Sequence, residues 1–193
     1  MFQRNELIDQ KILVEGFTPL SQGVLDTLQI LQCRAVLICL LIFPTHLCFG
    51  ASPLDRLAEA VRFKTVSSQN SAEIDYEAFQ GLNEFLARTY PRTFDQLEVE
   101  YINTHSILLR WLGSDPGQNP VLFTAHTDVV PIEIGTEVDW QHPPFAGVIA
   151  NNTLYGRGTL DDKQGVISLL EATETLLEEG FKPRRTLVFG FGH

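Results

Sequence analysis

Apolar residues recur at helical spacing in three stretches of the chain beyond residue 50. The first covers residues 53–63, where Pro53 suits the first turn of a helix. The second covers residues 74–90 and is expected to end at Pro91, and the third covers residues 162–179. The pattern therefore predicts three amphipathic helices whose apolar faces lie in the core.

Short β-prone runs lie between these helices. Residues 97–102 and 106–112 predict two strands joined by a tight turn, and residues 147–155 predict a hairpin. Residues 120–125 predict a buried strand, and residues 186–192 predict another strand after the third helix. A strand, a helix and a strand in this order are typical of a β-α-β unit, so the sequence predicts an α/β fold with a parallel strand pair.

Charge and cysteine content narrow the class of protein. The 193 residues include 14 basic and 24 acidic side chains, a balance that argues against nucleic acid as a partner. All three cysteines, Cys33, Cys39 and Cys48, lie in one early segment. The remaining chain therefore has neither a disulfide framework nor a cysteine-based zinc site available to it.

The early segment also contains an uncharged apolar run, AVLICLLIF, at residues 35–43. The run is shorter than the roughly 20 residues of a membrane-spanning helix and is typical of a secretory signal, with cleavage expected after Gly50. The long, partly acidic leader at residues 1–32 leaves a membrane-attached signal anchor open, and a buried core helix is the plainer alternative. We expect residues 1–50 to be a leader and the protein to be secreted or lumenal.

A glycosylation sequon, Asn151-Asn152-Thr153, coincides with the predicted turn of the hairpin at residues 147–155. Asparagine tolerates the positive φ angles that a tight hairpin turn requires. Asn151 is therefore a possible glycan acceptor if the protein enters the secretory pathway.

The candidate chemistry begins where the strand at residues 120–125 ends. His126 and Asp128 are two residues apart on an extended segment, so both side chains point to the same side. Asp128 can then bind one ring nitrogen of His126 and leave the other nitrogen free for a metal. Asp161 lies in a second acidic turn, directly before the third helix. A lone His-x-Asp is more often an ordinary polar loop, and the second acidic turn favours a site.

Three motifs then stand in order: HTDVVP at residues 126–131, WQHPPFAG at residues 140–147 and LYGRGTLDDK at residues 154–163. Together they resemble the signature of the M20 family of zinc metallopeptidases. The form is similar to the branch that contains Gly-X carboxypeptidase and the secreted N-fatty-acyl-amino acid synthase/hydrolases. The resemblance extends over roughly residues 53–193.

This resemblance implies a partial three-layer α/β/α catalytic domain of the zinc-exopeptidase type, with a mixed, mostly parallel sheet. It implies two zinc ions, with His126 as ligand of one, Asp161 as the bridging carboxylate and Asp128 as the catalytic-site residue beside His126. It also implies that the peptide bond between Asp161 and Asp162 is cis and that His142 is not a ligand. The implied substrate is a small peptide or an N-acyl amino acid, cleaved at the amide next to the amino acid.

In the family pattern a glutamate base, further metal ligands and a lid or dimerisation domain would follow His193. We therefore expect residues 51–193 to be the amino-terminal part of a catalytic domain, without hydrolase activity by itself. One rival hypothesis is a non-catalytic product that keeps a partial fold and binds a partner. Another is an unrelated α/β binding module whose acidic turns hold Ca²⁺ or Mg²⁺.

The aromatic residues of the long loop at residues 132–147 allow two interpretations. Trp140 and Phe145 can wall a substrate cleft, or they can pack the loop onto the domain. The sequence does not distinguish between these roles.

Overall fold

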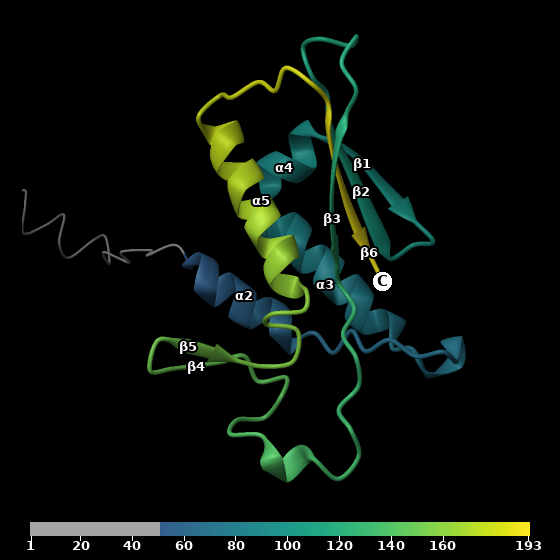
Figure 1. The fold of residues 1–193 in the computed structure, drawn as a ribbon, viewed down its shortest axis with the longest axis vertical. Coiled ribbons are helices and arrows are strands. Elements are labelled where there is room, and N and C mark those ends of the chain that lie inside the picture. The colour runs from purple at the N-terminus through teal and green to yellow at the C-terminus, as the bar shows by residue number, and fades with distance from the viewer. Residues whose placement is uncertain (1–50) are drawn as a thin grey trace, which may run out of the picture. The chain divides into compact units, whose positions relative to one another are not determined.

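The computed structural model describes residues 51–193 (Figure 1). The predicted leader, with its apolar run at residues 35–43, lies outside the described residues. Among residues 51–193, no helix is both long and apolar enough to cross a membrane.

Residues 51–193 form four α-helices, three of them where the apolar periodicity predicts them. Ser52 and Asp55 cap the first helix reciprocally, and Asp75 caps the second. The helices are α2 (Pro53–Arg62), α3 (Tyr76–Thr89), α4 (Pro91–Gln96) and α5 (Lys163–Glu178), and two short 3₁₀ turns cover Ser71–Glu73 and Glu137–Asp139.

The helix α4 is a departure from the sequence prediction, which expected Pro91 only to end a helix. Pro91 ends α3 and also begins α4, since proline is well suited to the first helical position. The backbone N–H groups of Arg92 and Thr93 donate to the carboxylate of Glu174 in α5, at 3.0 and 2.9 Å. The Thr93 hydroxyl donates to the same carboxylate at 2.8 Å. A side chain far along the sequence therefore caps α4.

The main sheet has four strands in the order β1-β2-β6-β3. The strands β3 and β6 are parallel, as the β-α-β order predicts, whereas the pairs β1/β2 and β2/β6 are antiparallel. The bounds are β1 (Glu98–Ile102), β2 (Ser106–Trp111), β3 (Val121–His126) and β6 (Leu187–Gly192), and the separate hairpin is β4 (Val148–Ala150) with β5 (Thr153–Tyr155).

The mixed α/β class is confirmed, but the sheet of residues 51–193 is not mostly parallel. Only one of its three strand pairs is parallel. For the β1/β2 pair the reason is local: Asn103 and Thr104 adopt positive φ angles in the tight turn after β1, and a turn this short can join only antiparallel strands.

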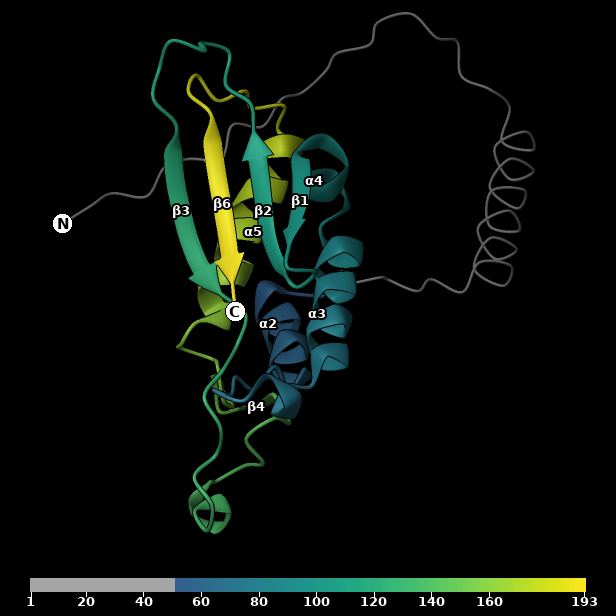
Figure 2. The same cartoon turned by 90° about the vertical axis from the view of Figure 1, so that its right-hand side faces the viewer.

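The described helices cover one face of the sheet (Figure 2). Leu122 on β3 is 62% exposed, whereas Ala125 on the same strand lies in the core. Residues 51–193 thus form two of the three expected layers. The core contains side chains from α2, α3, α5, β2, β3 and β6, among them Ala60, Leu82, Leu86, Ile107, Leu109, Ala125, Val166, Leu170, Phe189 and Phe191.

The cap of α4 gives a stability prediction. Glu174→Ala should lower the free energy of unfolding by about 1–2 kcal/mol, because it removes three hydrogen bonds from the first turn of α4. Urea unfolding of the wild-type and variant chains measures the difference. Glu178→Ala is the matched control: this side chain is 65% exposed and forms a surface ion pair with Arg92, so its removal should change stability little. Equal losses in the two variants would contradict the capping role of Glu174.

Candidate metal centre

The strand β3 delivers His126 to the end of the sheet, where the chain remains attached to β6. His126 is paired in register with Gly192, the last residue of β6. Thr127 then donates its backbone N–H and its hydroxyl to the Gly192 carbonyl, at 2.8 and 2.9 Å. These two bonds hold the segment after His126 against β6.

The opposite side of this segment is held by residues 65–67. Val129 donates its N–H to the Thr65 carbonyl at 2.8 Å, and Ser67 donates its N–H to the Val129 carbonyl at 3.0 Å. The buried hydroxyl of Thr65 donates to the Thr127 carbonyl at 2.6 Å. Residues 127–129 therefore lie between β6 and residues 65–67, which restricts where the side chains of His126 and Asp128 can point.

The structure brings the three predicted site residues together around the imidazole of His126. Nδ1 of His126 lies 3.2 Å from Oδ1 of Asp128, and Nε2 lies 2.9 Å from Oδ1 of Asp161. The side chain of Asp161 is 83% exposed, compared with 39% for His126 and 21% for Asp128. Each ring nitrogen thus faces one carboxylate, and the more solvent-exposed carboxylate faces Nε2.

The surroundings of His126 act on its pKa in opposite directions. Partial burial disfavours the charged ring, but the hydrogen bonds to Asp161 and Asp128 and the charges of both carboxylates outweigh this effect. The pKa of His126 is raised as a result. Two carboxylates that attract a proton to this ring can also attract a cation to it.

The turn that carries Asp161 lies against the segment that follows His126. Gly158 has a φ angle of +89°, and a Cβ atom at this position would lie 2.6 Å from Cγ1 of Val129. Only glycine permits both the backbone conformation and the close approach. The peptide bond between Asp161 and Asp162 is cis, as the family resemblance implies.

Lys163, the first residue of α5, is the neighbour of this turn that the sequence analysis did not single out. Its side chain is 1% exposed, and its ammonium group donates to the carbonyls of Ala60 at 2.9 Å and Phe63 at 2.6 Å. Burial lowers the pKa of Lys163 to about 7, and the negative charge of Asp128 opposes that shift. A lysine directly after two acidic residues is expected at the surface. The sequence therefore gives no signal that Lys163 is buried.

The donor atoms match zinc in kind but not in number. Imidazole nitrogen and carboxylate oxygen are both zinc ligands, and His126 and Asp161 converge from separate segments. A catalytic zinc normally has about three protein ligands and a water. Within residues 51–193, no group of three or more His, Cys, Asp or Glu side chains is placed to hold a metal ion. The roles predicted for His126, Asp128 and Asp161 toward a metal therefore stay predictions.

His142 and the aromatic residues of the long loop have other contacts. The His142 ring packs edge-on against Tyr155, with centroids 4.6 Å apart. The guanidinium of Arg157 lies 5.2 Å from the centroid of the Trp140 ring, and the ammonium of Lys64 lies 5.8 Å from that of Phe145. These cation–π contacts favour the interpretation in which the loop packs onto the domain.

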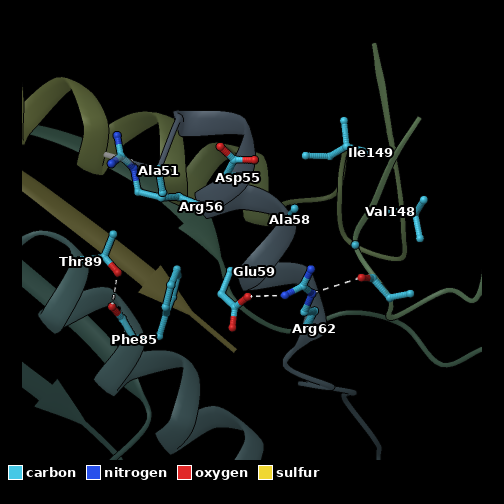
Figure 3. Close-up of a pocket in the computed structure, with 12 residues that line it drawn as sticks. Ala51, Asp55, Arg56, Ala58, Glu59, Arg62, Phe85, Thr89, Val148 and Ile149 are labelled. Carbon is cyan, nitrogen blue, oxygen red and sulfur yellow. Dashed lines mark hydrogen bonds and ion pairs between the residues drawn. The ribbon is translucent and has the colours of Figure 1, made fainter. Parts of the chain in front are cut away.

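A cavity of about 630 Å³ lies elsewhere, between α2, α3 and β4 (Figure 3). Its charged groups are already engaged: Arg62 pairs with Glu59 at 2.6 Å and donates to the Ala146 carbonyl at 3.2 Å. None of the three predicted site residues lines it. This cavity is therefore separate from the candidate metal centre.

Comparison with known proteins shows which proteins this chain is similar to. Residues 122–193 match the family described as Peptidase family M20/M25/M40. The "Probable carboxypeptidase S-like 2" of Dictyostelium discoideum is 44% identical over 140 residues, which are 72% of this chain and 27% of that protein. The "N-fatty-acyl-amino acid synthase/hydrolase PM20D1.1" of Danio rerio is 40% identical over 143 residues, which are 72% of this chain and 27% of that protein.

A solved structure agrees at the level of the fold. Human carnosine dipeptidase 1 superposes with a TM-score of 0.58 and 23% sequence identity, covering 72% of this chain and 31% of that one. The chain spans about a quarter of the length of the curated relatives that it matches. The predicted resemblance is confirmed: residues 122–193 match peptidase family M20/M25/M40, and these curated relatives are 44% and 40% identical to the chain.

Proposed function

We propose that the chain is the amino-terminal part of an M20-type zinc hydrolase that cleaves an amide bond next to an amino acid. The observation that carries this proposal is His126, held at the end of β3 with one carboxylate at each ring nitrogen. The names of the relatives, a carboxypeptidase and an N-fatty-acyl-amino acid synthase/hydrolase, support a small peptide or an N-acyl amino acid as the substrate.

In this proposal each site residue has a distinct task. His126 would be a ligand of one zinc ion, and Asp161 would be a carboxylate ligand shared by two ions. Nδ1 of His126 donates to the backbone carbonyl of Asp128 at 3.1 Å, with the Asp128 carboxylate 3.2 Å away, which keeps the lone pair of Nε2 available and fixes the orientation of the ring. When bound, the metal supplies polarisation of the scissile carbonyl and activation of water.

The proton on His126 competes with the metal for Nε2. In the arrangement described here, Nε2 is bonded to Asp161, so the ring must give up that bond before Nε2 can bind a cation. Because the exposed Asp161 side chain contacts His126 from a separate turn, it can rotate away without disturbing β3. The contact between Nδ1 and Asp128 does not depend on Asp161. It therefore keeps the His126 ring in place when the Asp161 side chain rotates.

We propose, as a second point, that the 193-residue chain is inactive by itself, although its family is catalytic. His126 and Asp161 provide two donors, and residues 51–193 hold no group of three or more His, Cys, Asp or Glu side chains that could bind a metal ion. The family resemblance implies that the general base follows His193. A chain of this kind can still keep its fold and bind a partner, which is the non-catalytic alternative.

An activity comparison tests both points. A chain extended with the carboxyl-terminal part of the Dictyostelium relative should release amino acids from dipeptides or N-acyl amino acids when zinc is present. The 193-residue chain should be slower by about 10²-fold or more, because loss of a general base alone removes roughly 10²–10⁴ in rate.

The controls separate the two proposals. In the extended chain, His126→Ala should abolish zinc-dependent turnover, and His142→Ala should leave it largely unchanged. An extended chain that folds and binds zinc but cleaves no such substrate would contradict the proposed function. Zinc-dependent turnover by the 193-residue chain that His126→Ala abolishes would contradict its proposed inactivity.

We also propose that the protein enters the secretory pathway through residues 35–43, either as a secreted or lumenal protein or with that run as a signal anchor. The position of the sequon is compatible with this route. Asn151 and Asn152 form the exposed turn of the β4-β5 hairpin, with φ angles of +51° and +58°. A glycan at such a turn would point into solvent and displace no packed side chain.

Expression in a secretory eukaryotic cell should give a product in the medium that begins near Ala51 and carries a glycan at Asn151. Mass spectrometry before and after glycosidase treatment measures both features. Asn151→Gln should remove the glycan, whereas Asn152→Gln keeps the pattern Asn-x-Thr and should retain it. Full-length product in the membrane fraction would instead indicate the signal anchor, and an unmodified cytosolic chain would exclude secretory entry.

A further inference from the structure

Lys163 has a position unusual for a charged side chain. Its 1% exposure removes the ammonium group from water, an arrangement that proteins tolerate only when the group is well paired. Both of its bonds go to the carboxyl end of α2, to the carbonyls of Ala60 and Phe63. These carbonyls carry the partial negative charge of a helix end, so they are suitable partners for a cation.

The Phe63 carbonyl begins a continuous path to the metal centre. Two residues later, Thr65 bonds to Val129 through its backbone carbonyl and to Thr127 through its hydroxyl. Residues 127–129 contain Asp128 and directly follow His126. The bond from Lys163 to Phe63 therefore fixes the segment that orients His126.

The other end of Lys163 is connected to Asp161. Lys163 follows Asp161 by two residues, and its backbone N–H donates to the Gly158 carbonyl at 3.1 Å. Its aliphatic stem packs in the space that a side chain at position 158 would occupy, since a Cβ atom there would lie 3.4 Å from Cδ of Lys163 and 2.6 Å from Cγ1 of Val129. Lys163 thus contacts the turn that carries Asp161 and residues 60–63, the segment directly before Thr65, which bonds to residues 127–129.

We infer that Lys163 is a positioning residue that sets the location of Asp161 relative to His126. It anchors the turn that carries Asp161 to residues 63–65, and through them to the segment after His126. The ammonium group itself bonds to backbone carbonyls, so Lys163 acts through neighbouring segments and not on substrate. This inference rests on the proposed function where it concerns zinc, whereas the placement of the His126 ring is independent of it.

The experiment uses the 193-residue chain and two readouts. The first is the ¹⁵N NMR spectrum of the His126 ring in the metal-free chain, which reports which ring nitrogens are hydrogen-bonded. The second is zinc affinity, measured by competition with a chelator. Lys163→Met should alter the His126 ring signals and weaken zinc binding by about 10-fold or more, as expected when a residue that supports a metal ligand is lost. Lys163→Arg retains N–H donors and should therefore keep part of the wild-type His126 ring signals and part of the zinc affinity.

Two matched variants separate positioning from simple loss of stability or charge. Lys182→Met removes a positive charge from an exposed site and should change neither readout. Leu170→Ala creates a cavity in the core face of α5 and lowers stability without touching the path described here. If Lys163→Met perturbs His126 no more than Leu170→Ala does at an equal folded fraction, the inference is wrong.

Thr65→Val tests the same path from the opposite side and keeps Lys163 intact. It removes the bond to the Thr127 carbonyl at nearly constant volume, so it should shift the His126 ring signals in the same sense as Lys163→Met. The effects of the two changes should be less than additive in the double variant. An unchanged His126 spectrum in Thr65→Val overturns the inference even if Lys163→Met does not fold.

The readouts also distinguish failure of this inference from failure of the proposed function. An extended chain that folds but binds no zinc would count against the proposed metal roles of His126 and Asp161. The metal-free spectra of the Lys163 and Thr65 variants would still decide whether Lys163 positions the ring.

Discussion

The structure depends on the double attachment of the segment that follows β3. Residues 127–129 bond to Gly192 on one side and to residues 65–67 on the other, so a segment that leaves the sheet keeps strand-like constraints. The backbone N–H and carbonyl groups of Thr127 and Val129 are hydrogen-bonded within the fold, and the side chains on either side of Thr127 have little freedom of direction. A histidine and a carboxylate two residues apart are thereby held ready on one side of the chain.

The buried Lys163 at the start of α5 also connects this region to α2, which is about 100 residues earlier in the sequence. Withdrawing an ammonium group from water is unfavourable unless its hydrogen bonds are replaced, and the carboxyl end of α2 supplies two carbonyls for it. The helix α2 therefore supports the candidate metal centre without placing a side chain in it. Such indirect support is common around metal ligands, whose orientation depends on the groups behind them.

Residues 51–193 bring together part of a candidate metal centre. One imidazole and one exposed carboxylate converge, with a second carboxylate behind the imidazole. The two carboxylates around the imidazole favour a cation. The number of donors, however, is below that of a catalytic zinc site. The relatives are about four times as long as the matched region, so the complete proteins have many further residues from which additional ligands can come.

The sequence by itself determined the elements whose signals are local. Apolar periodicity located α2, α3 and α5, the β-α-β order predicted the parallel pair of β3 and β6, and the spacing of His126 and Asp128 predicted their shared side. Only the tertiary structure decided the start of α4, the burial of Lys163 and the contact of His126 with Asp161. Each of these results depends on partners dozens of residues away, whose approach is set by packing against the sheet and not by any pattern of neighbouring residues.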